Sequence, residues 1–461
     1  MKKQKTKIFF LFLLSMIFVL GGFRCTFIQS KEEKNALKPV RLNYWRVWEG
    51  RNELNDILNA YRSLHPNISI NVRTLRFEEF EKELLEALAK DEAPDLVSLH
   101  QTWLKKYVDE AILTPMPPDI SMAYQYRKKT LGIKEETIVE FRTIKTPTLG
   151  QIKEKYIDDV SDKVVFDNKV YGLPYSVDTL VLFYNRDLLN NAGLPTPPKD
   201  WATFQNYIKT LTFFDENRNI AVVGTALGTS NNVRRSTDIV SLLMMQNGTV
   251  MQKNKNIYFH TIPEIFPDNT YHPGVEAVRF YTDFADPTRE VYTWNKTRDD
   301  SLVEFSRNNV AFYLGYSYDI PEIIAASKGS VNFGISTIPQ ISSIRPVNYA
   351  NYWVEAVTQK SKFKNEAWDF ILFASDPGMV KTFLTNAQRP TALRELISEQ
   401  TQDDLLRPFA EQLLTARSWY QGNNVAVAEE AIKGMINDVL NGTESLEAIN
   451  FAAKRVQETI K

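Results

Sequence analysis

Residues 171–204 read YGLPYSVDTLVLFYNRDLLNNAGLPTPPKDWATF, and this stretch alone indicates an α/β fold. Its apolar run at residues 180–184 (LVLFY) predicts a buried strand. Residues 187–192 predict a short helix, which is followed by a glycine in the C-cap position. Asp200 has a side chain preferred at an N-cap, so a second helix is expected over residues 201–211. A strand followed directly by capped helices is typical of layered α/β domains.

Strands and helices also alternate in the N-terminal quarter of the chain. Strands are predicted at residues 41–47 (RLNYWRV), 68–74 (ISINVRT) and 96–99 (LVSL). Helices are predicted between them, at residues 52–64 and 80–88, where apolar side chains recur at helical spacing. Because strand–helix–strand units are almost always right-handed and parallel, this order predicts a mostly parallel sheet.

The composition is that of an ordinary globular protein. The chain has 461 residues, 43% hydrophobic and 24% charged, so one large or two medium domains are expected. Its 55 basic and 56 acidic residues leave no general basic field to attract nucleic acid. One cysteine excludes an intrachain disulfide or a cysteine metal cluster, and four scattered histidines form no metal motif. Neither a nucleic-acid partner nor a metal is therefore expected.

The N-terminal 24 residues have the pattern of a secretory signal or membrane anchor. Four lysines in residues 1–7 precede sixteen apolar or small residues at 8–23. That run is marginal for a membrane-spanning helix, which needs about 17–25 residues. Cys25 follows at the position where bacterial lipoproteins are acylated, although Phe23 and Arg24 are not the small residues usual there. Lipidation at Cys25 and an uncleaved anchor both stay open, and either attaches the protein outside the cytoplasm to the cell membrane.

A polar stalk is expected at residues 25–38, between this segment and the folded body. Without residues 1–24 the chain has 50 basic and 56 acidic residues. The body is thus predicted to be mildly acidic and soluble rather than a binder of membrane surfaces.

Motifs that carry catalysis or bind nucleotides are missing from the sequence. No GxxxxGK[ST] or GxGxxG loop follows a strand, and neither HExxH nor GxSxG occurs. No cofactor is therefore expected. A carboxylate pair such as Glu49 and Asp178 could serve a glycosidase, but this needs a separation that the sequence does not give.

Aromatic and polar residues instead gather where predicted strands end. In open α/β sheets ligands bind beyond the carboxyl ends of the strands. Sugar rings stack on aromatic faces and their hydroxyls need planar polar partners, so these residues fit a saccharide cleft. The residues at strand ends are Trp45, Trp48 and Glu49, then His100, Gln101 and Trp103, then Tyr316, Tyr318 and Asp319.

Residues 171–204 resemble the signature of extracellular solute-binding proteins of ABC importers, in the sugar-binding group related to maltose-binding protein. Further stretches are similar to motifs of the same group and occur in the same order. Six motifs in order make the resemblance specific, and it spans most of residues 40–461. The further stretches are 93–97 (APDLV), 308–315 (NNVAFYLG), 333–339 (FGISTIP), 365–373 (NEAWDFILF) and 441–448 (NGTESLEA).

The resemblance implies two α/β lobes, each with a mixed, mostly parallel sheet, that close on a ligand by hinge motion. Crossovers between the lobes are expected near Asp178, Val354 and Arg389. Residues 113–167 match no motif, and we expect helices and loops that decorate one lobe. The implied boundaries are 39–178 and 355–388 for the first lobe and 179–354 and 389–461 for the second.

The resemblance also implies which residues face the cleft. Beyond the strand-end residues, these are Asp178, Asn231, Asn232, Tyr352, Trp353, Arg389, Trp419 and Tyr420. Residues 349–353 (YANYW) are bulkier than the glycine pair usual before the second crossover, so the floor of the cleft is expected to differ.

The expected function is a non-catalytic, membrane-tethered solute receptor, monomeric by default, that captures a sugar or oligosaccharide and delivers it to the permease of an ABC importer. Trp48, Trp103, Trp353 and Trp419 would stack on sugar rings, and Trp103→Ala is expected to weaken binding without affecting the fold. Three alternatives stay open: another solute such as a phosphorylated polyol or peptide, a secreted glycoside hydrolase, and a sensor or adhesion protein.

Overall fold

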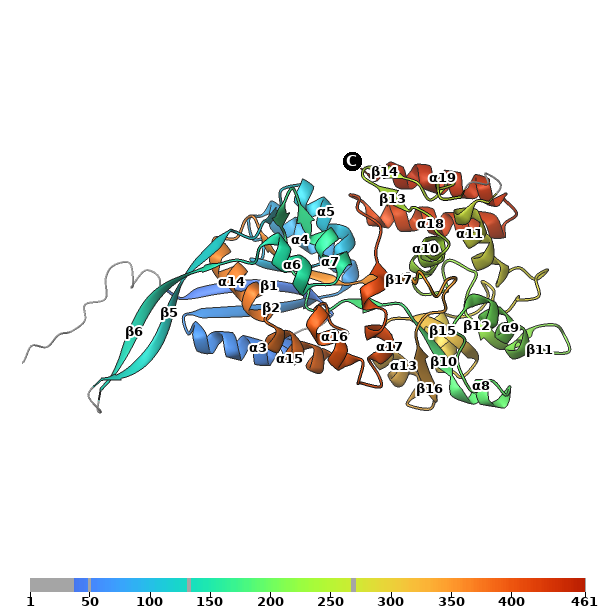
Figure 1. Ribbon diagram of the computed structural model, residues 1–461, viewed down its shortest axis with the longest axis horizontal. Helices are drawn as coiled ribbons and strands as arrows, with labels where there is room; N and C mark the ends of the chain where they lie inside the picture. The colour runs from blue at the N-terminus through green and yellow to red at the C-terminus, as the bar shows by residue number, and fades with distance from the viewer. Residues whose placement is uncertain (1–36, 49–50, 131–133, 267–270, 461) are drawn as a thin grey trace, which may run out of the picture.

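The computed structural model describes two lobes lying side by side (Figure 1). The described residues are 37–48, 51–130, 134–266 and 271–460. The predicted N-terminal signal or anchor segment, Cys25 and Glu49 lie outside them. Within the described ranges, no helix is both long enough and apolar enough to cross a membrane. Each lobe has a helix-covered sheet and a hydrophobic core, which confirms the predicted two-lobed α/β architecture.

The first lobe is built on a five-stranded sheet with the order β2-β1-β3-β18-β4. β1 pairs in parallel with β2 and β3, as the sequence pattern predicts, and β18 returns antiparallel to β3. α3 forms because Leu54, Ile57 and Tyr61 share one face, and that face is buried in the core of the lobe. The elements are β1 (Val40–Val47), α3 (Arg51–Leu64), β2 (Ile68–Leu75), α4 (Phe77–Ala89), β3 (Leu96–His100), α5 (Gln101–Asp109), β4 (Leu113–Thr114), β18 (Trp353–Thr358), α14 (Lys364–Ala374) and α15 (Pro377–Ala387).

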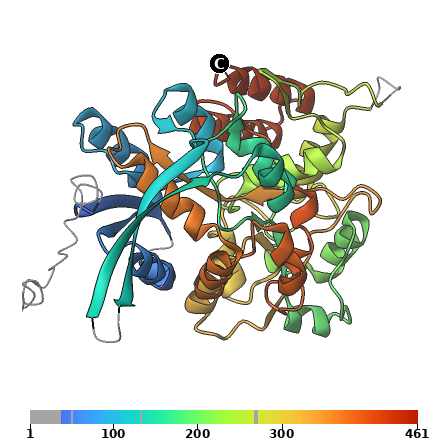
Figure 2. The same cartoon turned by 60° about the vertical axis from the view of Figure 1, so that its left-hand side comes forward.

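A long hairpin projects from the first lobe (Figures 1 and 2). Its strands β5 (Asp119–Thr130) and β6 (Lys134–Lys145) pair with each other along their whole length. The expectation of helices and loops was wrong here, because the ribbon buries few apolar side chains and so lacks a clear strand pattern. Its base contacts α3 and α14 and buries Ile120 and Met122. After the hairpin come α6 (Leu149–Lys155), α7 (Asp158–Val164), β7 (Val165–Phe166) and β8 (Lys169–Val170).

The second lobe has a sheet with the order β11-β12-β15-β10-β16. Antiparallel pairing predominates, since β10 runs antiparallel to both β15 and β16, so this sheet is less parallel than expected. The predicted caps are confirmed: Asp200 accepts a hydrogen bond from the Thr203 amide at 2.8 Å, and Gly193 adopts a φ of 70°. The strands are β10 (Val181–Asn185), β11 (Phe213–Phe214), β12 (Ile220–Thr225), β15 (Val310–Gly315) and β16 (Phe333–Ser336), with the separate pair β13 (Gln252–Lys253) and β14 (Asn256–Ile257).

Helices pack against this second sheet, and the C-terminal pair packs together and against the helices at residues 236–246 and 273–283 (Figure 1). The break predicted at Asn441-Gly442 separates the last two helices. The helices are α8 (Arg186–Asn191), α9 (Trp201–Leu211), α10 (Ser236–Gln246), α11 (Pro273–Asp283), α12 (Ser301–Ser306), α13 (Asp319–Ser327), α18 (Val425–Leu440) and α19 (Ser445–Gln457).

Three short strands, β9 (Asp178–Thr179), β17 (Asn348–Asn351) and β19 (Ala416–Arg417), carry the chain between the lobes. They form a sheet of their own in the order β19-β17-β9. At each of them the chain leaves one hydrophobic core and enters the other. The second crossing therefore precedes Val354, which lies in β18 of the first lobe.

The expected third crossing near Arg389 is wrong. Leu393 is buried in the core of the first lobe. It forms an isolated β-bridge with Tyr156, and Thr391 forms another with Ser176. Residues 389–393 thus run beside the first crossing without changing lobe, and α16 (Arg394–Gln400) contacts α6 of the first lobe. The chain reaches β19 through α17 (Arg407–Ala410) and the short helix η1 (Leu413–Thr415).

Candidate ligand-binding cleft

A cavity of about 500 Å³ lies between the lobes, and we call it the cleft. Its volume is within the range of about 300–1,000 Å³ typical of small-molecule sites. The first lobe contributes Trp48, Phe77, Glu81, His100, Thr102, Trp103, Lys106 and Trp353; the second contributes Arg235, Tyr318, residues 422–426 and Glu429; and the hinge strand β17 contributes Asn351.

Two smaller cavities continue the cleft at its floor. One of about 40 Å³ reaches toward the hinge and is lined by Arg46, Tyr175, Asp178, Glu355 and Arg389 among others; we call it the hinge pocket. Another of about 20 Å³ reaches under the second lobe, between His100 and Asp238. Asn351 lines all three cavities, so this hinge residue forms their common floor.

An aromatic wall covers the first-lobe side of the cleft. The ring centroids of Trp103 lie 5.3 Å from Phe77 and 5.7 Å from Trp353, and His100 lies 5.4 Å from Trp353. β3 and β18 place His100 and Trp353 side by side, because these residues are partners in the antiparallel register. The wall offers ring faces and edges to a flat, C–H-rich ligand.

Trp103 belongs to the protein core more than to the cleft surface. Its side chain is 6% exposed and packs within the core of the first lobe. The expectation that Trp103→Ala spares the fold is therefore revised. Truncating a buried tryptophan costs about 3–5 kcal/mol, and urea unfolding of the variant should show a loss of that size. A loss below about 1 kcal/mol would contradict this packing role.

Trp48 and Tyr318 face each other across the opening of the cleft, one from each lobe. Their rings are parallel to within 5°, with centroids 6.3 Å apart. Trp48 is 60% exposed and has a φ of 68°, which a tryptophan rarely adopts. Strained backbone of this kind costs about 1–3 kcal/mol and clusters at functional sites.

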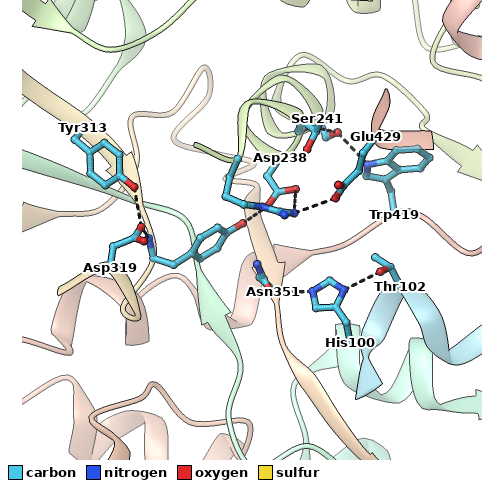
Figure 3. A network of polar contacts seen from close by, with 12 residues as sticks. His100, Thr102, Asp238, Ser241, Tyr313, Asp319, Asn351, Trp419 and Glu429 are labelled. Atoms are coloured by element: carbon cyan, nitrogen blue, oxygen red, sulfur yellow. Dashed lines mark hydrogen bonds and ion pairs between the residues drawn. The ribbon is translucent and has the colours of Figure 1, made fainter. Parts of the chain in front are cut away.

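A polar network covers the second-lobe side of the cleft (Figure 3). Arg235 donates from Nε and Nη2 to both carboxylate oxygens of Asp238, each at 2.8 Å, and Nη2 also reaches Glu429 at 3.3 Å. Tyr316 donates its hydroxyl to Asp238 at 2.7 Å. Although burial opposes the charge, Asp238 and Glu429 hold the pKa of Arg235 well above its ordinary value.

Asp319 supports this network from behind. Its carboxylate accepts hydrogen bonds from the Tyr316 amide at 3.0 Å and from the Tyr313 hydroxyl at 2.9 Å. Both bonds lie at the start of α13. Burial raises the pKa of Asp319 to about 6. Tyr316 and Asp319, both expected at the cleft surface, therefore lie one layer beneath Tyr318.

His100 is a neutral hydrogen-bonding group at the floor of the cleft (Figure 3). Its Nε2 is 2.9 Å from the amide oxygen of Asn351, and its Nδ1 is 2.7 Å from the Thr102 hydroxyl. Burial lowers the pKa of His100 to about 4, so the ring is uncharged at neutral pH. Because the Asn351 oxygen accepts, Nε2 carries the proton and Nδ1 accepts from Thr102.

The hinge pocket contains charged groups that are already engaged. Asp178 accepts the Ser317 amide at 2.9 Å and the Ser317 hydroxyl at 2.7 Å, and burial raises its pKa to about 7. Arg46 and Glu355 form a buried ion pair at 3.4 Å. The pocket thus offers oriented donors and acceptors without a large net charge.

The structure brings most of the predicted site residues to these cavities and leaves several away from them. Glu49 is outside the described residues, Trp45 packs under Arg73 at 4.8 Å, and Asn232 supports the loop around Asn295 within the second lobe. The residues at the cavities are Trp48, His100, Gln101, Trp103, Asp178, Tyr318, Tyr352, Trp353, Arg389, Trp419 and Tyr420. Those placed elsewhere are Trp45, Asn231, Asn232, Tyr316 and Asp319.

The burial of the tryptophans changes what they can contribute. Trp419 and Tyr420 lie in the core of the second lobe, and Trp419 donates its indole N–H to Ser241 at 3.0 Å. They bound the small cavity rather than cap the opening. Trp48 and Trp353 are the predicted tryptophans that lie open to the cleft.

Sequence reasoning missed several residues that line these cavities, among them Asn351, Arg235, Asp238 and Glu429. Asn351 lies in the segment at residues 349–353 (YANYW), whose unusual bulk before the second crossover indicated that the floor of the cleft differs. Arg235, Asp238 and Glu429 lie at or in α10 and α18, and no local motif distinguishes them from surface charges. Among the described residues, no group of three histidine, cysteine, aspartate or glutamate side chains is placed to hold a metal ion.

Comparison with known proteins identifies the relatives of this chain. A family model described as bacterial extracellular solute-binding protein matches residues 56–408. A maltodextrin-binding protein of Bacillus subtilis strain 168 is 25% identical over 361 residues, which cover 75% of this chain and 78% of that protein.

Solved structures share the fold. The cyclic alpha-maltosyl-1,6-maltose binding protein from Arthrobacter globiformis has a TM-score of 0.70 at 18% identity, covering 92% of this chain and 99% of that one. A cyclo/maltodextrin-binding protein complexed with maltotetraose has a TM-score of 0.69 at 16% identity, covering 92% and 98%. Both share the two-lobed arrangement of this chain.

Proposed function

Because the chain belongs to the bacterial extracellular solute-binding protein family, we propose that it is a membrane-tethered receptor that captures a sugar or oligosaccharide between its lobes. It would hand the bound solute to the permease of an ABC importer. The observation that carries the proposal is the cleft itself, where ring faces from both lobes flank charged groups that are paired with one another. Such a surface suits a ligand with C–H faces and many hydroxyls.

Closure of the lobes would supply the mechanism. A ligand that touches both walls binds the closed form better than the open form, and this difference in affinity drives closure. Trp48 and Trp353 would stack on sugar rings, while Asn351, His100 and Asp178 would bond hydroxyls at the floor. Arg389 would add a polar contact in the hinge pocket. The closed complex is then the form presented to the permease.

A phosphorylated solute is the less favoured alternative. It would need basic side chains without acidic partners in the cleft, and the described cations there are offset. Lys106 is paired with Glu81 at 2.6 Å, Arg235 with Asp238 at 2.8 Å, and Arg46 with Glu355 at 3.4 Å. In the hinge pocket burial raises the pKa of Asp178, and the charge of nearby Arg389 opposes that rise. The charges therefore support an uncharged solute.

A glycoside hydrolase is also less favoured. Glycosidases use two carboxylates placed on either side of the scissile bond, one of them protonated. Asp178 is held by Ser317, and Glu355 by Arg46 and Tyr44, so both described carboxylates of the hinge pocket are already engaged. A non-catalytic role agrees with a family of binding proteins.

Tethering would come from the N-terminal segment, through lipidated Cys25 or an uncleaved anchor. The family description as extracellular supports a location outside the cytoplasm. Cell fractionation of the native chain and of Cys25→Ser tests this part. Release of the variant into the soluble fraction would indicate a lipid anchor, and retention would indicate the apolar segment.

A thermal-shift screen of soluble residues 31–461 tests the binding function. The panel contains mono- and oligosaccharides, phosphosugars and polyols. Stabilisation that rises with saccharide concentration, with the saccharide recovered intact, is expected. A cleaved saccharide would indicate a hydrolase, and no shift with any saccharide would contradict the sugar assignment.

A further inference from the structure

The charges that line the cleft do not cancel completely. Glu81 and Lys106 form one pair at 2.6 Å, and Arg235 and Asp238 form another with two hydrogen bonds of 2.8 Å. Glu429 lines both the cleft and the small cavity beneath it, and its ion pair at 3.3 Å is with Arg235, the cation that Asp238 already binds. The described lining of these two cavities therefore carries one surplus negative charge.

Glu429 is held weakly compared with Asp238. Its Oε1 is 3.3 Å from the same Arg235 nitrogen that donates to Asp238 at 2.8 Å. Its side chain is 34% exposed, so a carboxylate oxygen can be reached from the cleft.

Arg235 cannot turn away to serve an anionic ligand. It is the N-cap residue of α10 with a φ of 52°, and its guanidinium is fixed by both oxygens of Asp238. Asp238 is fixed in turn by the Tyr316 hydroxyl at 2.7 Å. His100 across the cavity is neutral, so it supplies no compensating charge. Arg235 thus stays bound to Asp238, and Glu429 shares a guanidinium that another carboxylate already holds.

We propose that Glu429 determines the charge class of the solute, by accepting a hydroxyl or ammonium donor and repelling carboxylated or phosphorylated saccharides. This inference rests on the proposed saccharide-binding function. Like charges brought together at a closed interface are strongly disfavoured, whereas a hydrogen bond to an ionised carboxylate is stronger than a neutral one. Discrimination against an anionic analogue of at least tenfold is expected.

A competitive retention experiment tests the proposal. The full chain, purified in mild detergent, is mixed with gluco-, galacto- and manno-oligosaccharides of two to four units. Each is supplied in three forms: unmodified, with a carboxylate at C6, and with an amine at C6. Saccharides retained after rapid desalting are identified by mass spectrometry, so the three forms of one oligosaccharide compete directly.

Wild-type protein should retain unmodified or amino forms at least tenfold better than the matching carboxylated form. Glu429→Gln should narrow this ratio several-fold. Glu429→Ala provides a second variant, and circular dichroism checks that both are folded. Glu430→Gln is the matched control, since Glu430 is the next residue of α18, is 64% exposed and pairs with Lys433; it should behave like wild type.

Two results would overturn the assignment of Glu429. One is equal retention of carboxylated and unmodified forms by the wild type. The other is an unchanged ratio in both folded Glu429 variants. Retention of no saccharide in any form would instead reject the proposed saccharide function, and this inference with it.

Discussion

At the scale of single residues, backbone strain marks both walls of the cleft. Trp48 and Arg235 have φ values of 68° and 52°, and one comes from each lobe. Most other non-glycine residues with positive φ, such as Asp167 and Asn168, are of types that tolerate this conformation in turns, while Ala111, Arg218, Lys328 and Gln388 adopt it away from the cleft. A strained tryptophan and a strained arginine need support from their surroundings, and their shared location indicates a functional reason.

Trp48→Ala should weaken saccharide binding about tenfold, because it removes an exposed ring face worth about 1 kcal/mol or more. The free energy of unfolding should change by less than about 1 kcal/mol, since Trp48 lies outside the hydrophobic core. Isothermal titration calorimetry and urea unfolding measure the two effects. Phe213→Ala is the control, because Phe213 is equally exposed at 58% but lies on β11. Equal losses of affinity in both variants would contradict a role for Trp48.

Asp178 should make stability fall as pH rises. Its pKa is about 7 in the folded protein against an ordinary 3.8, so the folded state binds more protons between those values. The free energy of unfolding therefore decreases between about pH 4 and about pH 7, by at most about 4 kcal/mol. Asp178→Asn cannot ionise and should lose this slope, becoming more stable relative to wild type at pH 8 than at pH 4. Urea unfolding of both proteins between pH 4 and pH 8 measures this difference. The prediction would be refuted if the free energy of unfolding of the two proteins changed in parallel with pH.

At the scale of elements, amphipathic patterns predicted structure where one face is buried. α3 was located within a residue because Leu54, Ile57 and Tyr61 face the core, and β1 because it is an interior strand, paired on both sides. The β5–β6 hairpin was missed because only its base packs on the lobe, at α3 and α14. A ribbon without a buried face leaves little pattern to read.

The end of β15 has no room for a side chain. A Cβ on Gly315 would overlap the Asp319 carboxylate and the Tyr313 ring, which together hold the network behind the cleft. Gly315→Ala should therefore destabilise the protein by about 1–3 kcal/mol. Gly434→Ala is the matched control, since its Cβ would meet nothing nearer than Arg455 at 3.9 Å within α18. That variant should gain about 0.5–1 kcal/mol in urea unfolding. An unchanged free energy of unfolding in Gly315→Ala would show that Asp319 and Tyr313 can move to make room for the added methyl group.

At the scale of the whole molecule, the sequence predicted two lobes and the character of the site but not its electrostatics. Strand ends located His100 and Tyr318, because topology alone brings strand ends to one edge. Arg235 and Glu429 meet only because α10 and α18 pack together, and that long-range contact has no local signal. The misplaced third crossing has a similar cause, since residues 389–393 run beside β9 without entering the second lobe.

A ring contact between the lobes at the opening of the cleft should favour the closed form. The Trp48–Tyr318 ring pair spans the opening, and such pairs contribute about 0.5–1.5 kcal/mol. Loss of this contact should therefore shift the equilibrium toward the open form by up to about tenfold. A saccharide that prefers the closed form by more than about a hundredfold would leave it almost fully closed.

Small-angle X-ray scattering of soluble residues 31–461 tests this balance. The radius of gyration should fall when a saturating saccharide is added. Trp48→Ala, which lacks the ring pair, should be more expanded than wild type without ligand and should converge on the same compact value at saturation. Phe213→Ala should match wild type in both states. Identical scattering with and without a bound saccharide would mean that the two lobes form one rigid body. Ligand entry would then require local opening near Trp48 instead of hinge motion at β9, β17 and β19.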